Sequence, residues 1–191
     1  IDRPLMYEWN IWRLLTSMND ALSVVGNFKT DVAGNPLSTA SGKMPDIVAE
    51  YRDFWLACEV TLQAGFKQYE TESEPITRHV GNLQKEKLHS KYSKPVFGLF
   101  VAEKINVEVV NFLMLSATRV SSTYGGKVQI IPVNRISLEK WMLNNAHLKE
   151  TSSQHLHNLF LKLFETEMLS KTEEEWFEAC QIEFENLSLA V

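Results

Sequence analysis

The sequence predicts an α/β fold in which helices cover a central sheet and the C-terminal third is helical. Segments of strand character alternate with helical segments before residue 138, which is typical of a sheet covered by helices. One segment, PVFGLFVA at 95–102, is almost continuously apolar, as expected of a strand buried on both faces. From residue 138 onward the pattern is helical. The 191 residues are expected to form a single domain spanning 1–191.

The first elements are expected to be a helix and a long loop. Pro4 suits the first turn of a helix, and residues 5–18 carry apolar side chains at helical spacing. The stretch GNFKTDVAGNPLSTASGK, residues 26–43, is rich in Gly, Pro, Ser and Thr and is interpreted as loop. Two short strands are predicted next, at 47–51 and 54–62.

The later elements follow from the same periodicities. Gly65 is expected to end the second strand, and Pro75 to open a helix that runs to about His89. The remaining predicted elements are strands at 95–102 and 127–132 and helices at 107–120, 138–149, 153–169 and 172–187.

The composition predicts a cytoplasmic globular protein. A hydrophobic content of 45%, with ten Phe and five Trp, supplies a sizeable core. No apolar run approaches the roughly 20 residues that span a membrane, and no signal-peptide pattern is seen, so no membrane association is expected. Cys58 and Cys180 lie inside apolar or helical patterns and are interpreted as buried free thiols.

The charge pattern argues against a chain that holds nucleic acid unaided. The formal net charge is −5, and eight Glu but one Lys follow position 164. One modest basic stripe exists between residues 78 and 104, made of Arg78, Lys85, Lys87, Lys91, Lys94 and Lys104. This stripe is too small for a domain that reads DNA by itself.

Two acidic residues are predicted to meet across the first pair of strands. If Arg52 and Asp53 form a two-residue turn, opposed residues have numbers that sum to 105, so Asp46 faces Glu59. Side chains in that relation are about 5 Å apart at Cβ. Two such carboxylates repel each other unless one is protonated or a cation lies between them, and a divalent metal would bind both. Two strand-end carboxylates splayed into water are the alternative.

A third carboxylate interrupts an apolar helix stripe. Leu5, Glu8, Trp12 and Leu15 recur at spacings of three, four and three, which places them on one face of the first helix. A buried carboxylate needs a partner, and a metal site at the adjoining sheet would supply one. Alternatively, Glu8 lies at the edge of the stripe and reaches solvent or an Arg. A single cation would accommodate all three carboxylates.

These residues carry a resemblance to a nuclease family. Pro45-Asp46, followed after twelve residues by Glu59-Val60-Thr61, resembles the PD…(D/E)xK signature of restriction-type nucleases, with Thr where a Lys usually stands. The segments PLMYEWNIWRLL, MPDIVAEY, LACEVTLQAG, QYETESEPITRHVGNL and PVFGLFVAEKIN together resemble the catalytic domain of AlwI-like type IIS restriction enzymes and related nickases. The resemblance is strong over residues 4–106 and is closest to the small catalytic subunit of a heterodimeric enzyme of this type.

The resemblance implies a fold, an activity and a cofactor. The implied fold is a restriction-endonuclease-like PD-(D/E)xK core, with a central mixed sheet of four to five strands flanked by helices. The implied activity is Mg²⁺-dependent hydrolysis of one strand of double-stranded DNA, with Mn²⁺ able to substitute. Asp46, Glu59 and the Val60 carbonyl would bind the metal, and Glu8 would support it directly or through water.

Two further residues match positions at this family's active site. They are Glu72 and His79, in the segment ETESEPITRH. A solvated loop charge is the alternative for Glu72, and a helix-surface donor to phosphate is the alternative for His79. Because Thr61 replaces the usual Lys, another residue would have to orient the attacking water. The candidates are Gln63, Lys67, Gln68 and His79.

The resemblance also implies a partner. A larger nickase subunit would bind the recognition site, cut one strand and recruit this chain to cut the other, which gives a double-strand break. Two alternatives stay open. The missing Lys suggests a catalytically inactive interaction module of nuclease fold, and a free-standing repair or mobile-element nuclease is the second.

Overall fold

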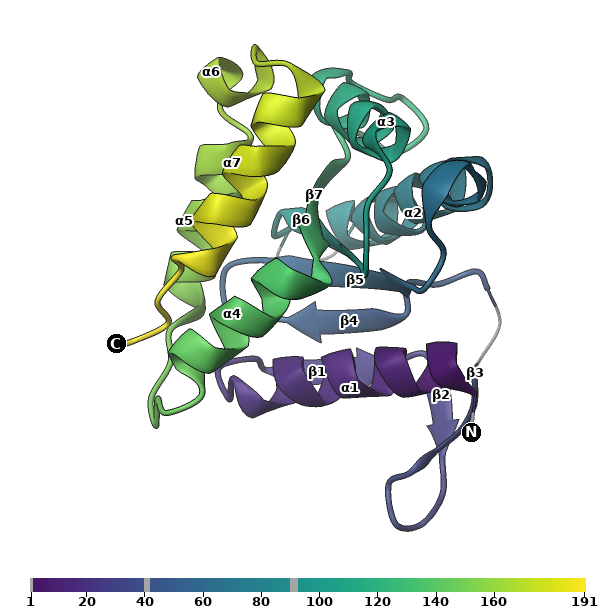
Figure 1. The fold of residues 1–191 in the computed structure, drawn as a ribbon, viewed down its shortest axis with the longest axis vertical. Helices are drawn as coiled ribbons and strands as arrows, with labels where there is room; N and C mark the ends of the chain where they lie inside the picture. Colours follow the sequence, from purple (N-terminus) through teal and green to yellow (C-terminus); the bar gives the residue numbers. More distant parts are fainter. Residues whose placement is uncertain (1, 40–41, 90–92) are drawn as a thin grey trace.

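The computed structural model describes residues 2–39, 42–89 and 93–191. Its centre is a mixed five-stranded sheet in the order β1-β4-β5-β6-β7 (Figure 1). The strands are β1 (Ser23–Gly26), β4 (Ile47–Glu50), β5 (Trp55–Thr61), β6 (Val96–Ala102) and β7 (Gln129–Asn134). The first three pair antiparallel, whereas β6 and β7 continue the sheet in parallel with β5.

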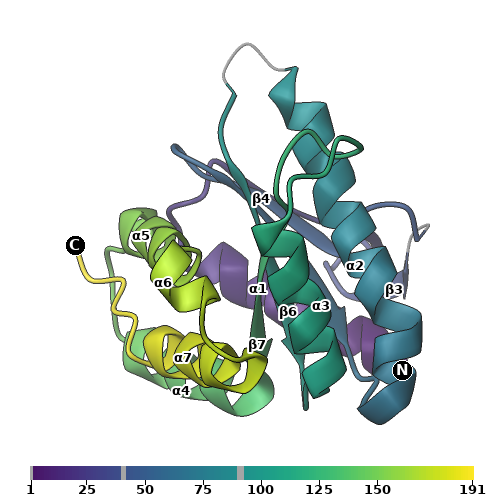
Figure 2. The ribbon, with the colours of Figure 1, turned by 90° about the horizontal axis from the view of Figure 1, so that it is seen from above.

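Helices cover both faces of this sheet. Figure 2 shows α4 to α7 on one side of the sheet and α2 on the other. One core cluster joins α1, α4, α5 and α7 to the sheet, and a second joins α2 and part of α3 to the opposite face. The helices of the described residues are α1 (Arg3–Ser17), α2 (Gly65–Leu88), α3 (Val107–Thr118), α4 (Arg135–Asn145), α5 (Ser153–Leu163), α6 (Thr166–Leu169) and α7 (Glu173–Glu185).

The central strand β6 is buried along its whole length, as its apolar sequence predicts. Phe97, Leu99 and Val101 pack with the α1 side of the core, and Phe100 and Ala102 pack with the α2 side. Successive side chains of a strand point to opposite faces, so one strand serves both clusters. The predicted α/β architecture and its helical C-terminal third are confirmed, although the helix predicted at 153–169 is divided into α5 and α6.

The interpretation of 26–43 as loop is wrong. Outside residues 40–41, which are not among the described residues, this stretch contains the end of β1 and a separate hairpin of β2 (Phe28–Thr30) and β3 (Pro36–Thr39). Helix α1 fixes these strands: Trp12 Nε1 donates to the Val24 carbonyl at 3.2 Å and Trp9 Nε1 to the Gly34 carbonyl at 3.1 Å. Contacts with α1 therefore stabilise strands in a stretch whose local composition favours a loop.

The predicted start of α2 is also wrong. The helix begins at Gly65, and Pro75 lies inside it. Gln68 anchors the first turn, because its Nε2 donates to the Gln63 and Lys104 carbonyls while its Oε1 accepts from Asn106 N. Burial of the helix face beyond Pro75 offsets the backbone hydrogen bond that a proline removes.

The cysteines and the apolar character of the helices were also considered in the sequence. Cys58 and Cys180 are both buried and free, as predicted. Within the described ranges, none of the helices combines the length and the apolar character needed to cross a membrane.

Candidate active site

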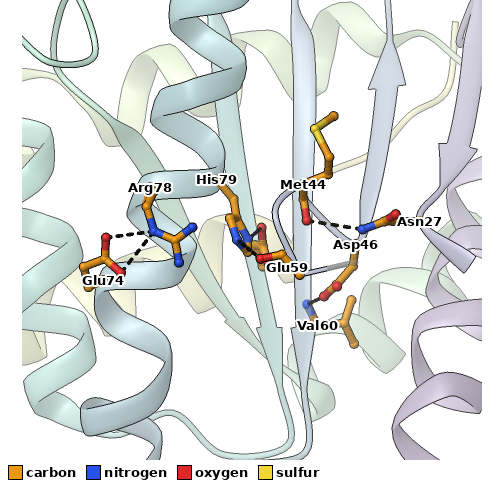
Figure 3. Close-up of polar contacts among 9 residues, drawn as sticks. Asn27, Met44, Asp46, Glu59, Val60, Glu74, Arg78 and His79 are labelled. Carbon is orange, nitrogen blue, oxygen red and sulfur yellow. Dashed lines mark hydrogen bonds and ion pairs between the residues drawn. The ribbon is translucent and has the colours of Figure 1, made fainter. Parts of the chain in front are cut away.

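The β4–β5 hairpin brings the first two predicted site residues together. Val48 lies opposite Ala57 and Ile47 opposite Cys58, which is the predicted register. Continued by one step beyond the start of β4, this register would place Asp46 opposite Glu59. The Asp46 carboxylate crosses to the neighbouring strand, where its Oδ2 accepts a hydrogen bond from Val60 N at 2.8 Å (Figure 3). A two-residue turn and the period of two along a strand were sufficient to predict this meeting.

Glu8 lies on α1, which packs against β4 and β5, and it is close enough to Asp46 to be affected by its charge. Glu8 is only 8% exposed and lies on the buried face that also carries Leu5, Ile11 and Leu15. Burial, together with the negative charges of Asp46 and Asp2, raises the pKa of Glu8 to about 7. The predicted stripe also included Trp12, but Trp12 is only half-buried, and its neighbour Ile11 is the buried residue in this turn. The alternative in which Glu8 reaches solvent is therefore wrong.

The three carboxylates share one electrostatic environment. Burial raises the pKa of Asp46 to about 6, against the lowering effect of the Val60 hydrogen bond. Burial also raises the pKa of Glu59 well above its usual range, and the charges of Asp46, Glu72 and Glu8 add to this effect. Such mutual repulsion in a poorly solvated place favours either protons or a cation.

His79 from α2 contacts Glu59 directly. Its Nδ1 lies 2.9 Å from Glu59 Oε1 (Figure 3). Its Nε2 lies 3.1 Å from the Gly42 carbonyl. A carbonyl only accepts, so Nε2 carries a hydrogen. Burial lowers the pKa of His79 and raises that of Glu59, so it disfavours the charged form of both members of the pair. His79 is buried, which contradicts the alternative of a helix-surface phosphate donor.

Glu72 lies on α2 and is half-buried, so the alternative of a solvated loop charge is wrong. Its Oε1 accepts a hydrogen bond from Thr61 Oγ1 at 3.0 Å. The residue that stands in place of the usual Lys therefore directs a fourth carboxylate toward the site.

The candidates that would substitute for that Lys differ in position. Gln68 is fully buried and committed to three backbone groups, which leaves it unsuited to the role. Lys67 is exposed, and Gln63 is half-buried. Of the four candidates, His79 alone forms a hydrogen bond with one of the carboxylates among the described residues, that of Glu59.

The donor chemistry of the site suits a hard divalent cation, because carboxylate oxygens are the ligands that Mg²⁺ prefers. Within the described part of the chain, however, no three His, Cys, Asp or Glu side chains already form a metal-binding cluster. Glu59 is turned toward His79, and Asp46 toward the Val60 amide. The side chains that would hold a cation are therefore engaged with partners in the protein.

The surrounding basic stripe is largely neutralised by ion pairs. Arg78 pairs with Glu74, as Figure 3 shows, Lys87 with Glu86, and Lys94 with Glu50, each at 2.9 Å. Lys85 and Lys104 are exposed. Lys91 lies outside the described residues.

Comparison with known proteins places this fold and site in context. The chain is similar to the small subunit (R.BspD6I2) of the heterodimeric restriction endonuclease R.BspD6I, whose crystal structure matches with a TM-score of 0.79 at 22% identity. The match covers 95% of this chain and 91% of that subunit. No curated protein sequence matches. The profile of the AlwI restriction endonuclease family matches residues 2–141, and the chain belongs to this family.

Proposed function

We propose that the chain is the small catalytic subunit of a heterodimeric type IIS restriction endonuclease, with a PD-(D/E)xK core, and that it hydrolyses one strand of double-stranded DNA with Mg²⁺. The observation that carries the proposal is the proximity of three carboxylates, those of Glu8 and Glu59, which are buried, and that of half-buried Asp46. The charge of Asp46 raises the pKa of both glutamates, and the charge of Glu8 raises the pKa of Glu59. A purely structural core has little use for such a group, because unpaired buried charges are costly.

Each residue has a distinct part in this mechanism. Asp46 and Glu59, with the Val60 carbonyl, would hold Mg²⁺, and Glu8 would support it directly or through water. When bound, Mg²⁺ supplies a Lewis acid that lowers the pKa of a water and stabilises charge at the scissile phosphate. His79 takes the proton that Glu59 gives up when it ionises, since Nδ1 lies 2.9 Å from its oxygen.

A partner follows from the charge of the chain. A net charge of −5 and a stripe largely consumed by ion pairs give little hold on DNA. A larger nickase subunit that binds the recognition site would place this domain at one phosphate. The high effective concentration of this domain at the DNA would then replace its weak intrinsic affinity for DNA.

One observation favours a second function. Thr61 stands where the family signature has Lys and donates to Glu72. A chain without that ammonium group would serve as an inactive module that only completes the assembly. Under the first function this chain cuts the second DNA strand, whereas under the second function that strand stays intact.

Strand cleavage after a single substitution tests the proposal. Asp46→Ala should lower the rate at which the assembled enzyme cuts its second strand by at least about 10³-fold, because one of two metal-holding carboxylates is lost. Supercoiled plasmid incubated with the large subunit should then stop at the nicked circle. Asp53→Ala, the same change at the exposed turn of the same hairpin, should leave linear product unchanged. Linear product from the Asp46 variant, or cleavage in excess chelator, would refute the mechanism.

A further inference from the structure

The segment Gly42–Asp46 carries Asp46 into β4, and neighbouring elements hold its backbone at several points. From α2, His79 Nε2 donates to the Gly42 carbonyl at 3.1 Å. From the end of β1, Asn27 donates twice: its backbone N–H to the Asp46 carbonyl at 2.7 Å, and its Nδ2 to the Met44 carbonyl at 3.4 Å. Figure 3 shows Asn27 on the opposite side of this segment from His79.

The position of the Asp46 carboxylate depends on this backbone. An aspartate side chain has two torsion angles, so its carboxylate follows its main chain closely. Asp46 Oδ2 accepts from Val60 N at 2.8 Å, which ties the carboxylate to β5 beside Glu59. The same residue is thus held at its main-chain carbonyl by Asn27 and at its side chain by Val60.

We propose that Asn27 is a positioning residue for Asp46, an inference that rests on the proposed function. Its two donors, one from the backbone and one from the amide, fix the carbonyls of Met44 and Asp46. This fixes the direction in which the Asp46 carboxylate faces Glu59. In this role Asn27 acts through Asp46 and is a positioning residue, not a catalytic one.

Asn27→Asp separates this role from simple electrostatics. The substitution keeps the shape and the backbone N–H but replaces the Nδ2 donor with an oxygen that repels the Met44 carbonyl. It also adds a negative charge near the carboxylate group, and charge alone would strengthen cation binding. A loss of cation affinity therefore requires that Asp46 has moved.

The matched control is Asn144→Asp. Asn144 Nδ2 donates to a backbone carbonyl, that of Glu185, at 3.0 Å on α4. The chemical change, the added charge and the kind of hydrogen bond lost are the same as at Asn27. Asn27→Ala removes the amide donor without adding charge and serves if Asn27→Asp does not fold.

Two measurements on the purified full chain test the proposal. Calorimetric titration with Mn²⁺ alone should give an affinity about tenfold lower for Asn27→Asp than for the parent, and an unchanged affinity for Asn144→Asp. In chelator, hydrogen exchange of the Val60 amide should be about tenfold faster in Asn27→Asp, with exchange in β6 unchanged. Equal or tighter Mn²⁺ binding by Asn27→Asp would overturn the proposal. If the parent itself binds no Mn²⁺, the proposed metal mechanism fails, and unaltered Val60 exchange would then overturn the role of Asn27 separately.

Discussion

Glu8 lies on the buried face of α1, where a carboxylate lowers stability once it is charged. Its pKa is about 7 in the folded protein, above the ordinary value of 4.5, because burial and Asp46 disfavour ionisation. A group whose pKa is raised by folding binds its proton more tightly in the folded state. The contribution of Glu8 to the free energy of unfolding is therefore complete below pH 4.5 and is lost as the pH rises to about 7.

Glu8→Gln should therefore stabilise the chain in chelator at pH 8 but not at pH 4.5. The expected gain in the free energy of unfolding is on the order of 1–2 kcal/mol, since one pKa unit corresponds to about 1.4 kcal/mol. Urea unfolding at both pH values measures it. Glu70→Gln, an exposed position on α2, should show no such pH-dependent gain. Parallel pH profiles for the parent and Glu8→Gln would contradict the burial of a titrating Glu8.

Residue-level reasoning reached Asp46, Glu59 and Glu8 because turn length and helical spacing fix which side chains share a face. It did not reach the hydrogen bond between His79 and Glu59, which depends on how α2 crosses the sheet. Asn27 was missed as well, since it fell in a stretch interpreted as loop. The β-branched pair Val24-Val25 followed by Gly26-Asn27 was the available signal of a strand end.

At the scale of elements, α2 shows why local signals misplace a boundary. Gly65 and Pro75 are both helix-breaking types, and the sequence predicted a helix that starts only at Pro75. The helix instead starts at Gly65, where φ is +66°, a conformation that glycine adopts readily. Contacts of Gln68 with the loops after β5 and β6 hold the added turns. The contact with Lys104 joins residues 36 positions apart in the sequence, so no local pattern reveals it.

Close packing of α2 against the segment before β7 gives an element-scale prediction. A Cβ at Gly81 would lie 2.5 Å from Tyr124 Cγ, and Gln84 Nε2 donates to the Tyr124 carbonyl at 3.0 Å. Gly81→Ala should destabilise the protein by about 1–3 kcal/mol, because the Tyr124 segment must shift. Thermal unfolding measures this loss. Asn82→Ala, at the exposed neighbouring position, should leave stability unchanged or raise it by a few tenths of a kcal/mol. Equal stability of the two variants would contradict the close approach.

At the scale of the whole molecule, charge is distributed unevenly between the two sides of the sheet. The acidic helix α7 packs on the face that also holds α1 and α4, whereas α2, whose four Lys and Arg residues balance its four Glu residues, covers the opposite face. This asymmetry orients the chain in the field of a polyanion but adds little affinity, because the net charge is −5. The partner subunit is therefore expected to place this chain at its cleavage site on the DNA.

The salt dependence of DNA binding tests this expectation. Lys85 and Lys104 are exposed, and the other described members of the stripe are ion-paired, so about two phosphates should be neutralised. The logarithm of the affinity of the isolated chain should then fall with the logarithm of salt concentration with a slope of about −2. Fluorescence anisotropy with a labelled duplex measures this slope. Lys104→Gln should reduce its magnitude by about one, whereas Lys171→Gln, in the acidic C-terminal region, should not.

With the large subunit present, second-strand cleavage should persist at salt concentrations where the isolated chain no longer binds, because tethering replaces affinity. A steep slope together with efficient site-specific cleavage by the chain alone would contradict its assignment as a recruited subunit.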